Sequence, residues 1–316
     1  MRELLSKPSA RILLQLAVSA IILWVLFRDT DLSAVWSTIQ RGSLGMLVAA
    51  LLVKASGLLV HEARLWLALP SPRPPLPRVI SLGLVAGVIN LALPARAGDV
   101  AAIAMLDREC EVPVPVGTAA VGVTSFLEAA LFACFLMAVV GMGAAQWVDI
   151  IGAGQNPILW IGLALTGGCV ALGIMGILGR WRRDQPAPAS RALAMIHQTL
   201  IETSQMVGSG RYLMIQSAAA AVQVVVVVAA FSLAMMASGA GVSEPVTAAS
   251  MVLAVSSLAA FVLPPTMAAG PAAASSLVLP HFGADPSGAL AYATVYWVVA
   301  HLPAVSMGLP ALFARR

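Results

Sequence analysis

Long apolar runs separated by short polar stretches make up almost the whole chain. Most runs extend over about 18 to 25 residues, enough for a helix to cross the hydrocarbon core of a bilayer, and they lack the alternation of barrel strands. In lipid every backbone amide and carbonyl must be bonded internally, which leaves helices or a closed barrel. The pattern therefore predicts an all-α polytopic membrane protein. The runs cover residues 12–27, 44–60 with an amphipathic extension to 69, 80–105, 116–140, 157–179, 213–237, 247–280 and 289–312.

Two of these runs are interrupted by proline and glycine. The run 80–105 contains "NLALPARAGD", and the run 247–280 contains "FVLPPTMAAGP". Proline removes a backbone donor and clashes with the preceding turn, so a helix ends or kinks there. Both interruptions consist of a Leu-Pro pair followed by glycine. We therefore expect a broken helix at each of them.

The composition supports lipid as the solvent of this chain. Of its 316 residues, 60% are hydrophobic and only 10% are charged, against about 25% charged in an average soluble domain. A water-soluble globule of this length covers itself with polar side chains, which are too few here. The formal net charge of +4 comes from basic residues scattered over short loops. That distribution indicates membrane topology and not nucleic-acid binding.

The basic residues predict which loops lie in the cytoplasm. Residues 1–11, 61–79 and 180–212 are rich in lysine and arginine, whereas 141–156 has neither. The positive-inside rule is satisfied when the run 80–105 enters and leaves by the cytoplasmic face and the run 247–280 is a re-entrant hairpin from the outside. The run 12–27 has no small-x-small cleavage site after it and is expected to be a retained helix. The prediction is about six spans and two re-entrant broken hairpins in a bacterial-type inner membrane, with both termini cytoplasmic.

These elements follow one another as span, span, hairpin, span, and then in the same order upside down. We therefore predict a single transmembrane domain, 1–316, built as an inverted repeat. The two repeats cover about 10–140 and 157–312, and 180–212 forms a basic cytoplasmic loop. Inverted repeats with discontinuous helices at matching positions point to a transport site near the midplane. The alternative is a bundle of ordinary kinked helices without transport activity.

Ionisable residues at membrane depth single out the first break. Such a residue costs about 2.5–3.5 kcal/mol on insertion scales and is a functional candidate by default. Glu128 lies at the centre of the run 116–140, and Arg96 and Asp99 flank Gly98 in the first break. Arg96 and a helix restarting after Gly98 would bind an anionic headgroup. The alternatives are a carboxyl that only packs two helices and an Arg96–Asp99 pair that only satisfies the broken backbone.

Other polar residues in the runs are assigned to headgroup contacts, helix packing or the membrane interface. We assign Asn90 to the same headgroup site, although Asn90 and Gln216 could equally be interhelical hydrogen-bond partners. The stretch "HEARLW" at 61–66 is interpreted as an interfacial helix end that places Arg64 and Trp66 at the headgroups. Lys54 is expected to extend its ammonium towards the interface.

The second break suggests a weaker second-half site. Its members are Pro264 and Gly270 in the break, with Tyr296 and His301 in the last run. A proton-relay role for His301 is conceivable. A histidine that packs in the bundle is the commoner case.

Enzyme signatures are absent from the sequence. There is no GxSxG, HExxH, Walker loop or GxGxxG after a strand. Its three cysteines form neither a CxxC pair nor a disulfide framework. We therefore expect no enzymatic activity, no catalytic residues, no bound metal and no cofactor.

The stretch "GVINLALPARAGDVAAIAMLDRE" at 87–109 resembles the lysylphosphatidylglycerol synthase transmembrane-domain family of flippase-like membrane proteins. Its Asn, Leu-Pro, Arg and Gly-Asp/Glu pattern, the mid-helix Glu128 and the late "LPPTMAAG" carry the resemblance over essentially the whole chain. The chain departs from the family at Ala102 and Ala129, where members often have arginine, and at 272–276, where a glutamate is usual. The aminoacyl-transferase domain of the synthases is missing, so lysyl transfer is not expected.

The resemblance implies a bundle with re-entrant helices that moves or accommodates a lipid. The leading interpretation is a lipid translocase, or lipid-handling protein, for an anionic or modified phospholipid or a polyprenyl-linked lipid. Glu128 and Asp99 would supply counter-charge or bind a coupling proton. One alternative is a secondary transporter of a small solute. Another is a non-transporting accessory subunit of a lipid or glycan pathway. The expected partners are membrane lipids and a biosynthetic enzyme, with no nucleic acid.

Overall fold

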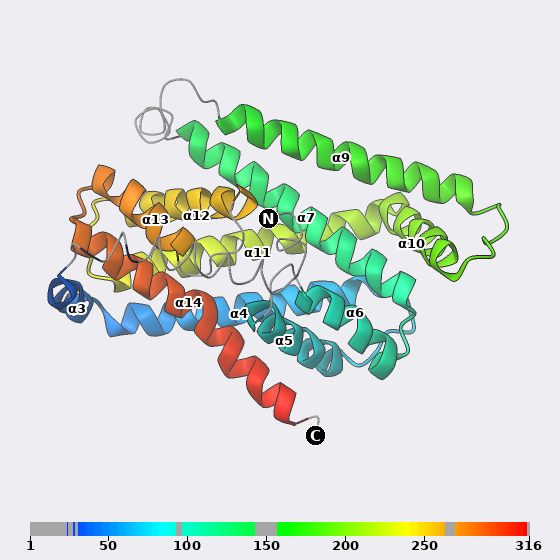
Figure 1. Ribbon diagram of the computed structural model, residues 1–316, viewed down its shortest axis with the longest axis horizontal. Coiled ribbons are helices and arrows are strands. Elements are labelled where there is room, and N and C mark those ends of the chain that lie inside the picture. The colour runs from blue at the N-terminus through cyan, green and yellow to red at the C-terminus, as the bar shows by residue number, and fades with distance from the viewer. Residues whose placement is uncertain are drawn as a thin grey trace, which may run out of the picture. The chain divides into compact units, whose positions relative to one another are not determined.

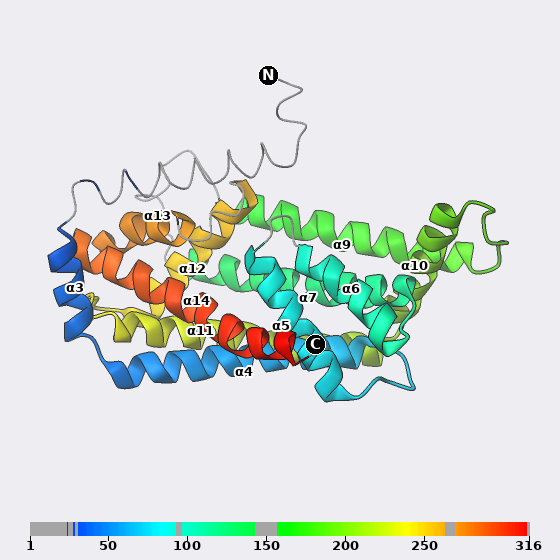
Figure 2. The same cartoon turned by 60° about the horizontal axis from the view of Figure 1, so that its bottom comes forward.

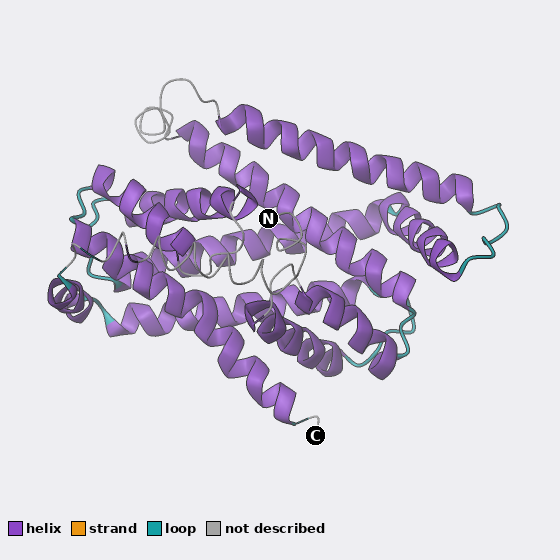
Figure 3. Cartoon of the chain, viewed as in Figure 1, coloured by secondary structure: helices purple, strands orange, loops and turns teal. Residues whose placement is uncertain are grey.

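The computed structural model describes Trp24, Arg28 and residues 31–92, 97–142, 157–262 and 269–314. Within these ranges the regular structure is entirely helical (Figures 1 and 3). The predicted all-α class is thus confirmed for the described residues. The helices are α3 (Leu32–Arg41), α4 (Leu44–Ala68), α5 (Leu76–Ala92), α6 (Ala97–Cys110), α7 (Val114–Met142), α9 (Pro157–Arg182), α10 (Arg191–Gly208), α11 (Gly210–Ala237), α12 (Pro245–Val262), α13 (Ala269–Val278), the 3-10 helix η1 (Leu279–Phe282) and α14 (Pro286–Phe313).

Four of the described helices are long and apolar enough to cross a membrane. The first predicted run, 12–27, lies outside the described residues except for Trp24. These helices also expose large apolar side chains, among them Leu52 and Val225, as expected for surfaces that contact lipid. The chain is therefore a multi-pass helical membrane protein. The four spans are Leu44–Ala68, Val114–Val139, Gly210–Ala237 and Pro286–Phe313.

The chain forms two compact units. One contains 56–141, 156–225 and 304–316; the other contains the remaining residues, including 226–303. Both units are discontinuous in the sequence, because α4, α11 and α14 each begin in one unit and end in the other. We call them the α5–α7 unit and the α12–α14 unit after the helices they contain.

Each predicted break falls between two helices that pack against each other. Residues 93–96 separate α5 from α6, and 263–268 separate α12 from α13; α5 lies beside α6 and α12 beside α13 (Figure 2). Pro94 and Pro264 belong to these linkers and lie outside the described residues. Re-entry of the helix pairs and the inverted repeat stay predictions.

The segment 180–212, expected to be a loop, contains the helix α10, which packs along α9. The two helices approach closely where Gly179 faces the backbone carbonyl of Leu200, a contact that leaves no room for a side chain. Nε2 of His197 lies 2.9 Å from the carbonyl oxygen of Arg182. The arginines of this segment were interpreted only as a sign of membrane topology, so its helical period was not recognised. That period buries His197, Ile201 and Ser204 on one face. The cytoplasmic location of this segment stays a prediction.

The core of the α5–α7 unit is aliphatic and surrounds the end of α4. Leu65 and Leu69 lie in it with Leu82 of α5, Leu106 of α6 and Val123 of α7. Each of these side chains is less than a tenth exposed. Because of this packing, Glu62 and Arg64 at this end of α4 are buried in protein. This burial determines the free-energy cost of leaving a charged group in the site without a partner.

Candidate functional site

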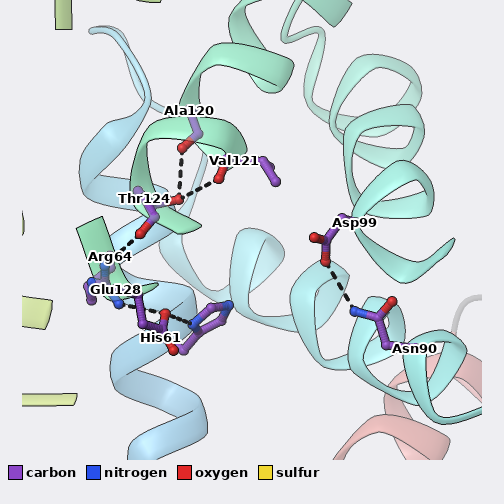
Figure 4. A network of polar contacts seen from close by, with 8 residues as sticks. All are labelled: His61, Arg64, Asn90, Asp99, Ala120, Val121, Thr124 and Glu128. Carbon is purple, nitrogen blue, oxygen red and sulfur yellow. Dashed lines mark hydrogen bonds and ion pairs between the residues drawn. The ribbon is translucent and has the colours of Figure 1, made fainter. Parts of the chain in front are cut away.

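An arginine and a glutamate from different helices pair inside the α5–α7 unit. Arg64 comes from α4 and Glu128 from the middle of α7. Nη1 of Arg64 donates to Oε2 of Glu128 at 2.8 Å, and Nη2 donates to the carbonyl oxygen of Thr124 at 3.0 Å (Figure 4). The residue Arg64 is only 1% exposed. Such a desolvated pair holds two helices in one register, because separating it leaves a buried charge without a partner.

Thr124 takes part in the contact through its backbone, while its hydroxyl stays within α7. The hydroxyl donates to the carbonyl oxygen of Ala120 at 2.7 Å and to that of Val121 at 3.2 Å. The carbonyl oxygen of Thr124 accepts from Arg64. The threonine and the glutamate are one helical turn apart and face the same side.

His61 adds a second donor to Glu128. Its Nδ1 lies 3.1 Å from Oε2 of Glu128, and since the carboxylate accepts from Arg64, Nδ1 carries the hydrogen. The side chains of His61 and Glu128 are 41% and 31% exposed, whereas that of Arg64 is 2% exposed. The cluster thus has a sealed cationic end and an open end.

Polar atoms without a partner surround the sealed end. Nε2 of Gln216 on α11 donates to the carbonyl oxygen of Arg64 at 3.0 Å. Nε of Arg64, Oε1 of Gln216 and the hydroxyl of Tyr212 are buried without a hydrogen-bond partner among the described residues. Gln216 confirms the interhelical role that its sequence position suggested. Buried polar atoms without a partner are energetically costly.

The first break is spanned by one asparagine. Nδ2 of Asn90 donates to Oδ1 of Asp99 at 3.1 Å, and Oδ1 of Asn90 accepts from the backbone amide of Gly98 at 2.6 Å. Asn90 is near the end of α5, and Gly98 and Asp99 are in the first turn of α6. The amide side chain therefore binds the start of α6 and fixes the hairpin. A side chain on Gly98 would overlap the carbonyl oxygen of Ala86 and Asn90 itself.

Glu62 is buried between these two groups. It is 6% exposed, and its carboxyl packs on Gly83 of α5, where a side chain would overlap it. Both Glu128 and Asp99 interact with it electrostatically. Glu62 therefore interacts both with the Arg64–Glu128 pair and with the start of α6 at the break.

The structure brings together four predicted residues of the first-half site in this unit: Asn90, Gly98, Asp99 and Glu128. Arg96, the fifth, lies outside the described residues. The interfacial interpretation of Arg64 is wrong, because α4 continues to Ala68 and turns Arg64 towards α7.

The second-half residues are less connected. Tyr296 is buried and stacks on Phe231 with ring centroids 4.1 Å apart. His301 is stacked on Trp297, and its Nδ1 lies 2.8 Å from the carbonyl oxygen of that residue. Gly270 lies in the first turn of α13 without a hydrogen bond or ring contact to either in the described residues, and Pro264 is outside them. These contacts fit the packing interpretation of His301.

Sequence reasoning missed His61, Glu62 and Arg64 as site residues. A signal was available, because His61 and Arg64 are one turn apart and place both donors on one helix face. Glu62 could have been noticed as a carboxyl inside the amphipathic extension of an apolar run.

The candidate site contains side chains of the kinds that bind polar ligands and exchange protons. It offers three carboxyl groups, one guanidinium and one imidazole from three helices. In the described ranges no group of three His, Cys, Asp or Glu side chains is placed to hold a metal ion.

Comparison with known proteins gives one match. The family model described as lysylphosphatidylglycerol synthase TM region matches residues 12–308. Neither the curated proteins nor the solved structures yielded a match.

Proposed function

The chain belongs to the lysylphosphatidylglycerol synthase TM-region family, and on that premise we propose that it is a lipid translocase or lipid-handling protein of the inner membrane. The lipid headgroup would enter at the open end of the Arg64–Glu128 pair, beside the α5–α6 break. Its lipid would be an anionic or modified phospholipid or a polyprenyl-linked lipid. The protein would act without enzymatic chemistry, and both termini would be cytoplasmic.

The observation that carries this proposal is the hydrogen bonding of Asn90 across the break. A helix interrupted at membrane depth exposes backbone groups that are tolerated only where protein or a cavity satisfies them. Here one side chain satisfies the first turn of α6 and keeps the hairpin together. Discontinuous helices of this kind supply polar ligands to transported substrates. The half-exposed His61 and Glu128 offer such ligands in the same unit.

Arg96 is the cation that we propose for the anionic contact. The guanidinium of Arg64 is occupied by Glu128 and Thr124 and is nearly inaccessible. An anionic headgroup would therefore bind Arg96 and the start of α6, while Arg64 stays structural. Arg96→Ala separates these roles, because it should slow lipid movement without loosening α4 from α7.

Replacement of Asn90 by alanine should slow lipid movement strongly. The variant loses one bond to Asp99 and one to the amide of Gly98, each of which contributes about 0.5–1.5 kcal/mol. The initial rate is expected to fall by about tenfold or more, a barrier change of about 1.4 kcal/mol. The measurement is accessibility of a fluorescent phospholipid to a membrane-impermeant quencher in proteoliposomes.

Gln198→Ala is the matched control for Asn90→Ala. It also removes one amide side chain, but its Nε2 bonds only to Glu202 on the exposed face of α10, at 2.6 Å. This variant should move lipid at the wild-type rate. Equal rates of lipid movement for Asn90→Ala and Gln198→Ala would show that the hydrogen bonds across the break are not required for lipid movement.

Two other functions give different results in the same vesicles. A secondary transporter of a small solute would show saturable uptake and no lipid movement. An accessory subunit would show neither activity alone and would co-purify with a lipid or glycan biosynthetic enzyme.

A further inference from the structure

We propose that Glu62 is a proton-binding site, occupied in this conformation, whose proton is exchanged during lipid movement. The coupling part of this inference rests on the function proposed above; proton binding itself does not. The coupling proton, which the sequence assigned to Glu128 or Asp99, is placed here on Glu62, a residue that the sequence did not single out. The step is balanced simply: the carboxylate of Glu62 takes one proton from water and later returns it.

Burial without a donor is the first argument. Glu62 is 6% exposed, and no described residue donates a hydrogen bond to its carboxyl. A carboxylate removed from water and left without donors is strongly disfavoured, and the group neutralises instead. In contrast, Glu128 receives bonds from both Arg64 and His61. Of these two carboxyls, Glu128 is the one that remains an anion.

The surrounding charges give the second argument. From α4 itself, His61 and Arg64 face the Glu62–Glu128 region; from α7 comes Glu128, and from α6 comes Asp99. The guanidinium of Arg64 is hydrogen-bonded to Glu128 and not to Glu62. Glu128 and Asp99 therefore oppose ionisation of Glu62 while His61 favours it, and among the described residues the guanidinium of this cluster is already bound to Glu128. Like charges that share a site cannot all ionise.

Packing on α5 gives the third argument. The carboxyl of Glu62 lies where the side chain of residue 83 would be, and glycine provides the space. Arg78, the ionisable residue of α5, is exposed at its beginning, so α5 brings no counter-charge to this position. The fold thus accommodates a neutral carboxyl at this place. Because α5 also carries Asn90, a shift of the α5–α6 hairpin would uncover Glu62 and change the headgroup position together.

His61 gives the proton a route to water. It precedes Glu62 on α4, its side chain is 41% exposed, and it interacts electrostatically with Glu62. An imidazole is the side chain that accepts and returns protons most readily near neutral pH. We expect His61 to be the exchange partner at the open end.

Infrared spectroscopy of the full chain in lipid nanodiscs tests the proton site directly. At neutral pH the wild type should show the carbonyl stretch of a protonated carboxyl, and Glu62→Gln should lack that band. Glutamine resembles the protonated acid in shape and charge, so this variant is expected to fold. The control Glu244→Gln, at an exposed glutamate, should keep the band. A wild type without the band, or a band that persists in Glu62→Gln, overturns the proposal.

Proteoliposomes with an imposed pH difference test the coupling. The wild-type rate of lipid movement should change by up to about tenfold per pH unit, since one unit is a tenfold proton ratio. Glu62→Gln should move lipid at a rate that ignores the gradient. A wild type that moves lipid regardless of the gradient overturns the coupling. A wild type that moves no lipid overturns the proposed function, while the infrared band still decides proton binding.

Discussion

Arg64→Leu is expected to be the most destabilising single substitution in the α5–α7 unit. It leaves the carboxylate of Glu128 in the bundle with His61 as its remaining donor, and it opens the contact to the carbonyl oxygen of Thr124. Breaking a buried ion pair by removing one partner costs about 3–5 kcal/mol. We expect less folded protein in the membrane and a lower unfolding midpoint, measured by heating purified protein and separating monomer from aggregate.

The cause of that loss can be isolated with two further variants. Arg183→Leu removes an exposed arginine from the end of α9 and should leave the midpoint unchanged. Arg64→Leu combined with Glu128→Leu removes both charges and should recover a large part of the stability, because apolar residues often replace a buried pair without loss. A double variant no more stable than Arg64→Leu alone would show that the ion pair is not the reason.

The breaks were the part of the fold most accessible from sequence. Proline beside glycine inside an apolar run has few interpretations, since proline ends a helix and glycine allows the chain to reverse. Asn90, Gly98 and Asp99 could be assigned to one site because they lie within ten residues of each other around one break. The structure places them together through the two bonds of Asn90. The short separation of these residues along the chain was sufficient to predict that they lie together.

The partner of Glu128 was not accessible in the same way. Arg64 is 64 residues away along the chain, and its position in an amphipathic extension equally fits a headgroup anchor. Deciding between the two requires knowing which helix lies beside α4, and a single sequence does not contain this. The same limit applies to Glu62, whose burial depends on the missing side chain of Gly83 on another helix. Pairings between helices come from packing, which hydropathy does not describe.

The helix α10 shows a different reason for a missed element. Its residues are polar enough to resemble a loop, and its apolar residues are divided between an exposed group that includes Leu193 and Ile196 and a buried group that includes Ile201. The arginines around it favoured a topological interpretation. Burial of His197 and Ser204 against α9 shows that polar residues also occupy the packed face. An amphipathic helix with a partly polar inner face has a weak periodic signal.

Gly98→Ala is expected to block lipid movement most completely while leaving the protein in the membrane. The added methyl group would overlap both the carbonyl oxygen of Ala86 and the side chain of Asn90, so α5 and α6 must separate. Overpacking of this kind costs about 1–3 kcal/mol. The first turn of α6 would then lose its bond to Asn90 and its place beside the break. We expect quencher accessibility in proteoliposomes to show no movement above protein-free vesicles.

Two variants decide whether the contact with the backbone is the cause. Gly87→Ala on α5 meets no atom within 4 Å, so it should keep wild-type movement, and the helix should gain about 0.5–1 kcal/mol. Gly98→Ala combined with Asn90→Ala removes the flexible side chain from the overlap but leaves the carbonyl of Ala86, which cannot withdraw without moving α5. The double variant should therefore be as inactive as Gly98→Ala. Recovery in the double variant would mean that Asn90 alone was in the way, and that close backbone approach of α5 and α6 is not what the site requires.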